Sequence, residues 1–298
     1  MIVPEPGKLA GLDRQIFVGK QNMGKRVVLI TGCSSGIGLA LAQAFRARDC
    51  LVVPTARRAQ DVATLRQQGW QALQLDVTKA ESMAQVVASI EQDYGKLDVL
   101  VNNAGYGQFG ALMDLTLDDL RRQYDTNVFA PVALVRAALP LLRRSASARV
   151  VNIGSVSGLL TTPFAGAYCS SKAALHALSD ALRMELAPFG MHVITIQPGA
   201  IQSRMGENGA AQVVIPPDSA YQPIAQAVHA RSTLSQQGAS PANQFAEQLA
   251  QAVLKPKPAR LVRLGNNSFN AWFLARCIPQ ALLDSKMMRY FSLDRLKP

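Results

Sequence analysis

Short apolar runs alternate with longer amphipathic stretches along most of this chain. Seven runs rich in valine, isoleucine and leucine have the length and composition of buried strands, at 26–31, 51–55, 72–75, 97–101, 150–153, 193–197 and 259–264. Helical periodicity fills the intervals 37–48, 59–68, 79–93, 117–142, 168–187 and 242–254. Strands that alternate with helices form parallel sheets, and right-handed crossovers place the helices on both faces. The pattern predicts an α/β fold, a single doubly wound domain with a seven-stranded parallel sheet.

Three segments fall outside this alternation. Residues 1–24 contain several prolines and glycines and predict an irregular N-terminal arm before a central domain at 25–265. Residues 201–241 are polar and rich in glycine and proline, and they are too long for an ordinary connection. We expect them to form a lid over a substrate site or a disordered loop. Residues 266–298 predict a basic, amphipathic and helical extension.

Composition narrows the class of protein. A chain of 298 residues with 49% apolar composition can bury a large core. The four cysteines have neither metal-ligand nor CxxC spacing, which predicts free thiols, a reducing compartment and no metal site. The chain opens on no signal-peptide pattern and has no uncharged apolar run of spanning length, so we expect a soluble, cytoplasmic protein without a transmembrane segment.

Charge is concentrated near the C-terminus. The formal net charge is +11, and the part from Lys255 onward holds nine basic and two acidic residues. No aromatic–basic interleaving or DNA-reading motif accompanies this charge, so we expect no nucleic-acid partner. The apolar residues at 269–291 lie among the basic ones, which fits contact with an anionic membrane or packing over a substrate pocket or partner subunit. Pro279 interrupts a continuous helix and favours packing.

The first predicted strand runs directly into a glycine-rich turn that opens a helix. Turns of this kind bind phosphate, because the helix N-terminus favours negative charge. Gly32 permits the tight turn, Gly36 lets the backbone approach a pyrophosphate, and Gly38 allows close packing of the helix on the strand. The turn predicts a dinucleotide site in a Rossmann-like domain, with contacts from Gly32, Ser34, Ser35, Gly36, Ile37 and Gly38. The alternative is a glycine-rich turn without a ligand.

The end of the second predicted strand indicates which dinucleotide binds. An NAD site needs an acidic residue there, whereas this chain has Arg57 and Arg58. Guanidinium groups bind a 2′-phosphate through paired hydrogen bonds, and a carboxylate would repel it. We predict NADP(H) in preference to NAD(H), with Arg57 as the main contact and Arg58 or Ser35 helping. One of the two arginines is alternatively a solvated residue at a helix start.

Redox chemistry at a carbonyl is suggested by three further residues. Tyr168 and Lys172 are four residues apart in a predicted helix and therefore share a face. A neighbouring ammonium lowers the pKa of a phenol from its usual value of about 10 and makes it a better proton donor and acceptor at neutral pH. The hydroxyl of Ser155 can hold a carbonyl or alkoxide oxygen beside Tyr168. Taken alone, the Tyr–Lys pair is equally well a chance surface pair.

The ordered set of motifs resembles the short-chain dehydrogenase/reductase family from about residue 25 to residue 265. The matching motifs are Thr31-Gly32-x-x-x-Gly36-x-Gly38, Asp76-Val77, Asn102-Asn103-Ala104-Gly105, Asn127, Ser155, Tyr168-x-x-x-Lys172 and Pro198-Gly199. The resemblance implies four catalytic residues, Asn127, Ser155, Tyr168 and Lys172. Tyr168 would be the acid/base, Lys172 would also bind the nicotinamide ribose, and Asn127 would hold a water that links Lys172 to solvent.

The resemblance also implies cofactor contacts beyond the glycine-rich turn. These come from Asp76, Val77, Asn103, Ala104, Gly105, Tyr168, Lys172, Pro198, Gly199, Ile201 and Ser203. Two alternatives remain open: Asp76 could initiate the next helix, and residues 102–105 could be a turn that ties strands together. Family members pair through the helices at 117–142 and 168–187, which implies a homodimer or homotetramer.

The combined prediction is an NADP(H)-dependent oxidoreductase that acts on a carbonyl or secondary alcohol. Segments 105–109 and 158–164 and the lid are mainly apolar, as small-molecule pockets usually are. With the arginines at 57 and 58, they resemble the family members that act on steroids, retinoids or long-chain ketones. The alternative is a non-catalytic dinucleotide-sensing or scaffold protein, in contact with a membrane surface. The four filled catalytic positions favour an enzyme.

Overall fold

A seven-stranded parallel sheet forms the centre of the computed structural model, which describes residues 24–203, 213 and 215–296. The strand order is β3-β2-β1-β4-β5-β6-β7. The strands are β1 (Val27–Ile30), β2 (Leu51–Ala56), β3 (Leu73–Gln74), β4 (Val99–Asn102), β5 (Arg149–Ile153), β6 (His192–Pro198) and β7 (Leu261–Leu264). All seven predicted strands are confirmed, and every neighbouring pair is parallel. The predicted arm, apart from Gly24, lies outside the described residues.

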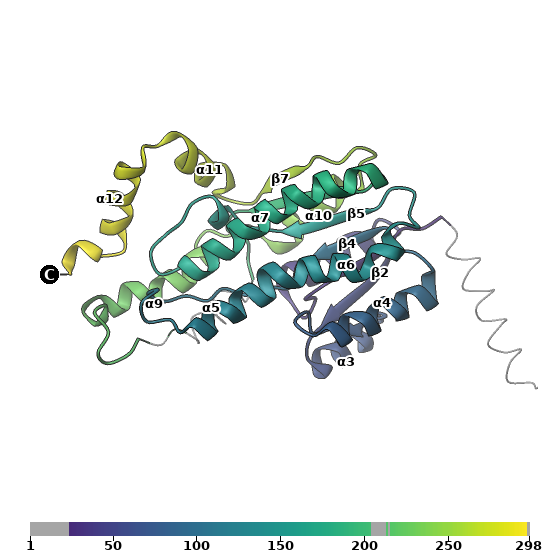
Figure 1. Ribbon diagram of the computed structural model, residues 1–298, viewed down its shortest axis with the longest axis horizontal. Coiled ribbons are helices and arrows are strands. Elements are labelled where there is room, and N and C mark those ends of the chain that lie inside the picture. Colours follow the sequence, from purple (N-terminus) through teal and green to yellow (C-terminus); the bar gives the residue numbers. More distant parts are fainter. Residues whose placement is uncertain (1–23, 204–212, 214, 297–298) are drawn as a thin grey trace, which may run out of the picture.

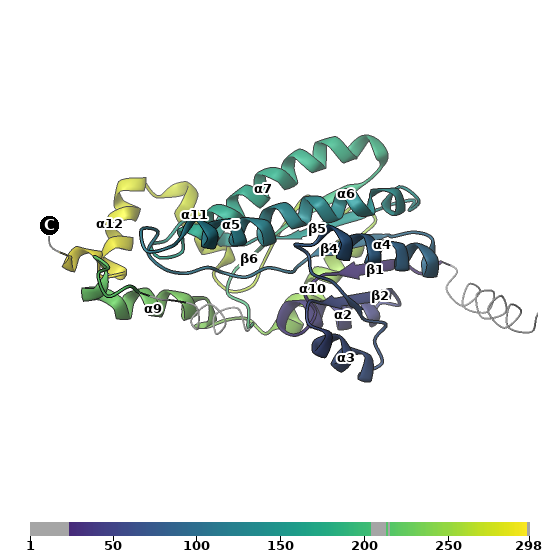
Figure 2. The ribbon, with the colours of Figure 1, turned by 60° about the horizontal axis from the view of Figure 1, so that its bottom comes forward.

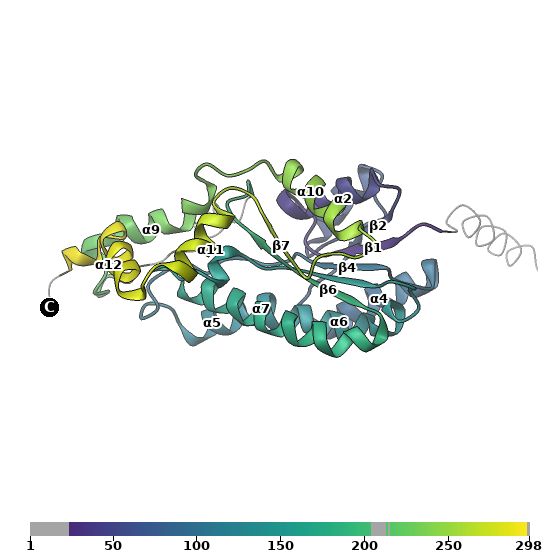
Figure 3. The same ribbon diagram turned by 90° about the horizontal axis from the view of Figure 1, so that it is seen from above.

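Helices cover both faces of the sheet (Figures 1 and 3). One face carries α2 (Gly36–Arg46), α3 (Ala59–Gln67) and α10 (Ala242–Leu254), and the other carries α4 (Ala80–Tyr94), α6 (Ala130–Leu142) and α7 (Gly166–Leu186). Successive strand residues enter opposite cores, so Val28 and Ile30 pack with the first group of helices and Val27 and Leu29 with the second. Coverage of both faces explains why the strands are apolar at almost every position.

The predicted helix at 117–142 is divided into three parts. Helix α5 (Leu117–Tyr124) is followed by a π-helical segment, Asp125–Phe129, and then by α6. Pro131 stands at the start of α6 and has no backbone N–H to donate to the carbonyl of Asn127, four residues earlier. The helix widens over the turn before it. Single π-helical turns are frequent at functional sites, and this one carries the buried Asn127.

Within the part of the chain that the structure describes, one helical run, 117–142, is long and apolar enough to span a membrane. Half of its most apolar window is buried against the rest of the protein. A core helix of a sheet protein passes the same test of length and composition, so the run is weak evidence for a span.

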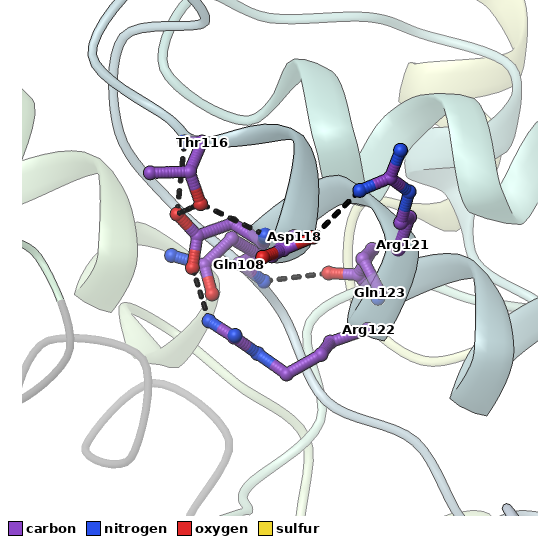
Figure 4. A network of polar contacts seen from close by, with 7 residues as sticks. Gln108, Thr116, Asp118, Arg121, Arg122 and Gln123 are labelled. Carbon is purple, nitrogen blue, oxygen red and sulfur yellow. Dashed lines mark hydrogen bonds and ion pairs between the residues drawn. The ribbon is translucent and has the colours of Figure 1, made fainter.

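Helix α5 begins at a capping box (Figure 4). The hydroxyl of Thr116 accepts a hydrogen bond from the Asp119 amide at 3.1 Å, and the Asp119 carboxylate accepts one from the Thr116 amide at 2.9 Å. At the other end of α5, the side chain of the fully buried Gln123 accepts from the Gln108 amide at 2.6 Å. These contacts tie α5 to the loop that follows β4.

Helix α9 (Ala225–Thr233) and the C-terminal extension project beyond one end of the sheet, opposite the start of β1 (Figures 1 to 3). Residues 201–241 were expected to form a lid or a disordered loop, and α9 shows that the disordered alternative was wrong for this part. Residues 204–212 and 214 of the predicted lid lie outside the described residues. The extension is helical as predicted, with α11 (Ser268–Cys277) and α12 (Gln280–Tyr290) separated at Pro279.

Candidate functional site

Tyr168 lies in a third buried cluster, distinct from the two cores on the faces of the sheet. Its side chain is 8% exposed. The cluster gathers residues from the loop after β4, the start of α7, the lid and the extension: Phe109, Ala111, Phe164, Ala165, Tyr168, Cys169, Val213, Ile224, Val228 and Phe291. The ring of Phe164 meets those of Tyr221 and Phe291 edge to face, with centroids 5.8 and 6.1 Å away. We call this group the apolar site cluster.

The structure brings Ser155, Tyr168 and Lys172 together. Tyr168 and Lys172 lie one turn apart on α7, and Ser155 follows the end of β5. The hydroxyl of Ser155 is a hydrogen-bonding neighbour of the Tyr168 phenol. The ammonium of Lys172 donates to the carbonyl of Ile153 at 2.8 Å and lies 5.9 Å from the centre of the Tyr168 ring. The spacing in the sequence therefore corresponds to one buried constellation.

The acidity of Tyr168 differs from the sequence-based expectation. Burial raises the pKa of the Tyr168 phenol, and the hydrogen bond with Ser155 opposes that rise without cancelling it. Burial also lowers the pKa of Lys172 to about 8. The expectation that a nearby ammonium lowers the Tyr168 pKa was wrong for this structure, because desolvation of a phenolate among apolar side chains is the larger effect.

Asn127 lies close to Lys172, on the π-helical turn between α5 and α6. Its amide nitrogen donates to Tyr106 O at 3.0 Å and to Ser171 Oγ at 3.2 Å, and its oxygen accepts from Tyr106 N at 3.2 Å. A Cβ added at Gly105 would lie 3.0 Å from this oxygen and 3.8 Å from Lys172 Nζ. Asn127 therefore also fixes the loop after β4 against the helices.

His176 belongs to this constellation and was missed in the sequence. It lies one turn beyond Lys172 on α7, and its Nε2 accepts a hydrogen bond from the Ser155 amide at 3.4 Å. A Cβ at Gly154 would come within 2.3 Å of Nε2, so the glycine admits the ring. Burial lowers the pKa of His176 to about 4, which leaves a neutral ring at neutral pH. The signal was present: positions 168, 172 and 176 share one helix face.

The glycine-rich turn has the geometry that phosphate binding requires. Gly32 has φ +71°, and a Cβ there would lie 2.9 Å from the Ala104 Cα. A Cβ at Gly38 would lie 2.1 Å from Gly32 O, so only glycine lets α2 approach β1 this closely. Ser35 lies in an extended conformation at the N-terminus of α2. Because the first amides of a helix point out from its N-terminus, this cradle fits the phosphates of a dinucleotide.

The turn at Asn103 to Gly105 ties strands together, as one alternative proposed. The hydroxyl of Thr31 accepts from Asn103 N at 2.9 Å and from Ala104 N at 2.8 Å. The Asn103 amide donates to Thr31 O at 2.8 Å and to Gly32 O at 3.0 Å. This arrangement holds the turn directly against the glycine-rich loop.

Asp76 is held by its own turn just before α4. Its carboxylate accepts from the Thr78 amide at 3.0 Å and from the Thr78 hydroxyl at 2.7 Å. Burial acts to raise the pKa of Asp76, but these hydrogen bonds and the charges of Arg57 and Lys79 lower it overall. Val77 packs at the edge of the core beneath α4.

Arg57 and Arg58 differ in what they contact. Arg58 forms a bidentate ion pair with Asp61 in the first turn of α3, at 2.8 and 3.0 Å. The exposed Arg57 has no recorded hydrogen bond or ion pair from its guanidinium to any residue that the structure describes. Arg58 is thus the helix-start residue of the two, and Arg57 is the one available to a ligand.

The segment after β6 closes the same edge of the sheet. Ala200 bridges Asn266, and a Cβ at Gly199 would lie 2.0 Å from the Asn266 carbonyl. Ser203 N donates to Gln236 Oε1 at 3.0 Å, and a Cβ at Gly36 would lie 3.4 Å from Ser203 Cβ. The remaining predicted contacts of this segment, Pro198 and Ile201, are buried.

Comparison with known proteins agrees with this arrangement. The family model described as short chain dehydrogenase matches residues 26–213. This chain belongs to the short-chain dehydrogenase family. As a short-chain dehydrogenase it is an oxidoreductase that acts on a hydroxyl or carbonyl group, and family members bind a nicotinamide dinucleotide.

Relatives of this short-chain dehydrogenase cover most of its length. The short-chain dehydrogenase ptmH of Penicillium ochrochloron is 37% identical over 266 residues, covering 88% of this chain and 96% of the relative. The NADPH-dependent 3-dehydrocapnine reductase of Ornithobacterium rhinotracheale is 37% identical over 189 residues, 60% of this chain and 67% of the relative. The crystal structure of a short-chain dehydrogenase from Streptomyces avermitilis superposes with a TM-score of 0.74 at 32% identity, covering 91% and 98% of the two chains.

Proposed function

We propose that this short-chain dehydrogenase is an NADP(H)-dependent reductase of apolar ketones, of the steroid, retinoid or long-chain class. The observation that carries the proposal is the buried group Ser155, Tyr168 and Lys172, in which Ser155 is a hydrogen-bonding neighbour of Tyr168 and Lys172 lies on the same helix face as Tyr168. A proton donor, an oxygen-binding hydroxyl and a cation therefore lie beside the aromatic and aliphatic side chains of the apolar site cluster.

Each polar residue has a distinct part in the reaction. NADPH held by the glycine-rich turn, Arg57 and Lys172 would supply the hydride that reduces the carbonyl carbon. Tyr168 donates its phenolic proton to the carbonyl oxygen, and Ser155 holds that oxygen by a hydrogen bond. Lys172 would bind the ribose and return a proton to Tyr168, through a water that Asn127 would hold. Because burial raises the pKa of Tyr168, the phenol stays protonated at neutral pH, which suits the reductive direction.

Arg57 supports the preference for NADP(H). Its guanidinium is exposed at the end of β2, beside Asp76 and without a hydrogen-bond partner among the described residues. A 2′-phosphate would accept paired hydrogen bonds there. The Ornithobacterium relative is named for NADPH dependence, which agrees with the proposal.

We further propose a cytoplasmic homo-oligomer that can touch a membrane surface. Leu117, Phe129 and Met184 are exposed on the helices expected to pair subunits, at 67%, 58% and 62%. Phe269 and Phe273 of α11 are likewise exposed. Co-sedimentation with anionic liposomes, before and after both phenylalanines are changed to serine, tests the membrane contact. Equal sedimentation of the two proteins removes it.

The test of the proposed function is Tyr168→Phe. The variant keeps the ring in the apolar site cluster and removes only the proton donor. NADPH oxidation is followed with ketosteroids, retinal and long-chain ketones, and we expect the rate to fall at least about a hundredfold while cofactor binding survives. Tyr221→Phe is the matched control, since it makes the same change in a tyrosine that packs against the apolar site cluster through Phe164. An unchanged rate in Tyr168→Phe contradicts the assignment, and cofactor binding without turnover of any ketone by the native chain supports a sensing or scaffold protein.

A further inference from the structure

A buried arginine from the lid enters the apolar site cluster. Arg231 lies on α9 and is 6% exposed. Its Nε donates to Thr162 Oγ1 at 2.7 Å, and its guanidinium carbon lies 5.3 Å from the centre of the Phe109 ring. A charged group therefore occupies the part of the lid that covers Tyr168.

This guanidinium has no counter-ion among the described residues. No carboxylate in 24–203, 213 or 215–296 forms an ion pair with it, and its recorded neighbours are neutral: Thr162, Phe109, Tyr168, Cys169 and Tyr290. A buried charge without a partner is costly, and a guanidinium carries five N–H donors in a planar fork. Thr162 and Cys169 are the two neutral hydrogen-bonding neighbours, and they leave some of the five N–H donors for another acceptor.

The charge lies close to the reaction centre. The Phe109 ring is 5.9 Å from the Tyr168 ring, so Arg231 and Tyr168 flank the same aromatic side chain. The charge of Arg231 also acts on the Tyr168 phenol. A substrate whose carbonyl oxygen meets Ser155 and Tyr168 would extend past Phe109 toward the guanidinium.

We propose that Arg231 binds an anionic group of the substrate, so that the natural ketone is an apolar molecule that also carries a carboxylate or a chemically similar acid. This inference rests on the proposed function and narrows its substrate class. The aliphatic and aromatic residues of the cluster contact the hydrocarbon part of the substrate. The guanidinium of Arg231 binds its acidic end and so fixes the orientation of the substrate and the position of its carbonyl.

The probes are 4-oxo-, 6-oxo- and 8-oxododecanoate, each compared with its methyl ester, which removes the charge and little else. Binding is measured by calorimetry in the presence of NADP⁺, and turnover by NADPH oxidation. We expect at least one acid to bind and react about tenfold or more better than its ester, as a charge-assisted hydrogen-bond pair implies. Arg231→Met should abolish this preference for the acid over its ester, and Arg231→Lys should keep part of the preference.

Folding and competing counter-ions are controlled separately. Arg231→Met removes an isolated buried charge at similar volume, so its melting temperature should equal or exceed that of the native chain. Glu207, which lies outside the described residues, is changed to glutamine as the matched control and should leave the ratio unaltered. A strong rise in acid binding in Glu207→Gln would show that the chain itself supplies the counter-ion and would overturn the proposal.

The outcomes separate this inference from the proposed function. Reduction of the esters without any preference for the acids, or a preference that persists in Arg231→Met, refutes the anion site and leaves the reductase standing. If Arg231→Met lowers the turnover of acid and ester equally, the anion site is also refuted. The guanidinium would then act on Tyr168 rather than on the substrate. Selective binding of an acid without turnover supports the anion site and refutes the reductase.

Discussion

The backbone amide of Ser155 donates a hydrogen bond to the imidazole of His176 at 3.4 Å. One turn of α7 thus supports the loop that carries the oxygen-binding hydroxyl. The ring fills the space left by Gly154 and Gly158, where a Cβ would approach it within 2.3 and 2.7 Å. His176 is therefore a positioning residue for Ser155.

His176 makes the protein sensitive to acid. Its pKa is about 4 in the folded chain, below the usual 6.5, so the unfolded chain takes up a proton between these values before the folded chain does. The free energy of unfolding therefore falls as the pH is lowered through this window, by about 3 kcal/mol at most. His176→Gln keeps an acceptor for Ser155 and cannot titrate. Between pH 7 and pH 4.5, urea denaturation should therefore show a smaller fall in the free energy of unfolding for this variant than for the native chain. The exposed His229, changed to glutamine, is the control; a loss in His176→Gln equal to that of the native chain contradicts the prediction.

Arg57 is expected to distinguish the two cofactors. Arg57→Ala should raise the KM for NADPH about tenfold to a hundredfold and leave that for NADH nearly unchanged, because only NADPH carries the 2′-phosphate. Arg58→Ala is the matched control, since Arg58 already pairs with Asp61. Steady-state kinetics with both cofactors measures the effect. An equal rise in KM for NADPH and NADH would contradict the assignment of Arg57 to the 2′-phosphate.

The hydroxyl of Thr31 is expected to stabilise the contact between the glycine-rich turn and the segment that follows β4. Thr31→Val keeps the shape but leaves the backbone amide of Ala104 without an acceptor and that of Asn103 with Val101 O alone. We expect the free energy of unfolding to fall by about 2 kcal/mol. Thr31→Ser keeps the hydroxyl and should retain most of the native free energy of unfolding. Urea denaturation of the three proteins checks this, and similar stabilities of the valine and serine variants would disprove it.

Phe291 is expected to anchor the C-terminal extension over the site. It is 4% exposed and packs against Phe164. Phe291→Ala should lower the free energy of unfolding by about 3 kcal/mol and raise the KM for apolar ketones. Its neighbour Tyr290 is 64% exposed, and Tyr290→Ala should have little effect on stability. Thermal melts and kinetics measure both variants, and indistinguishable results would show that the extension is not part of the site.

The sequence by itself determined the sheet, the glycine-rich turn and the meeting of Tyr168 with Lys172. These features depend on local periodicity, because strand residues alternate between faces and residues four apart share a helix face. The order of the motifs also sufficed to identify the family. Helix α9 escaped notice because its own pattern is weak, and the packing of Val228 and Ile224 in the apolar site cluster stabilises it.

Only the tertiary structure decided how these groups behave. It placed Arg231 beside Phe109, placed the His176 ring where it accepts from the Ser155 amide, and distinguished the exposed Arg57 from Arg58, which pairs with Asp61. It also reversed the expected shift of the Tyr168 pKa. The reason is common to all of these: desolvation and pairing depend on side chains far apart in the sequence, and no local pattern records which of them will meet.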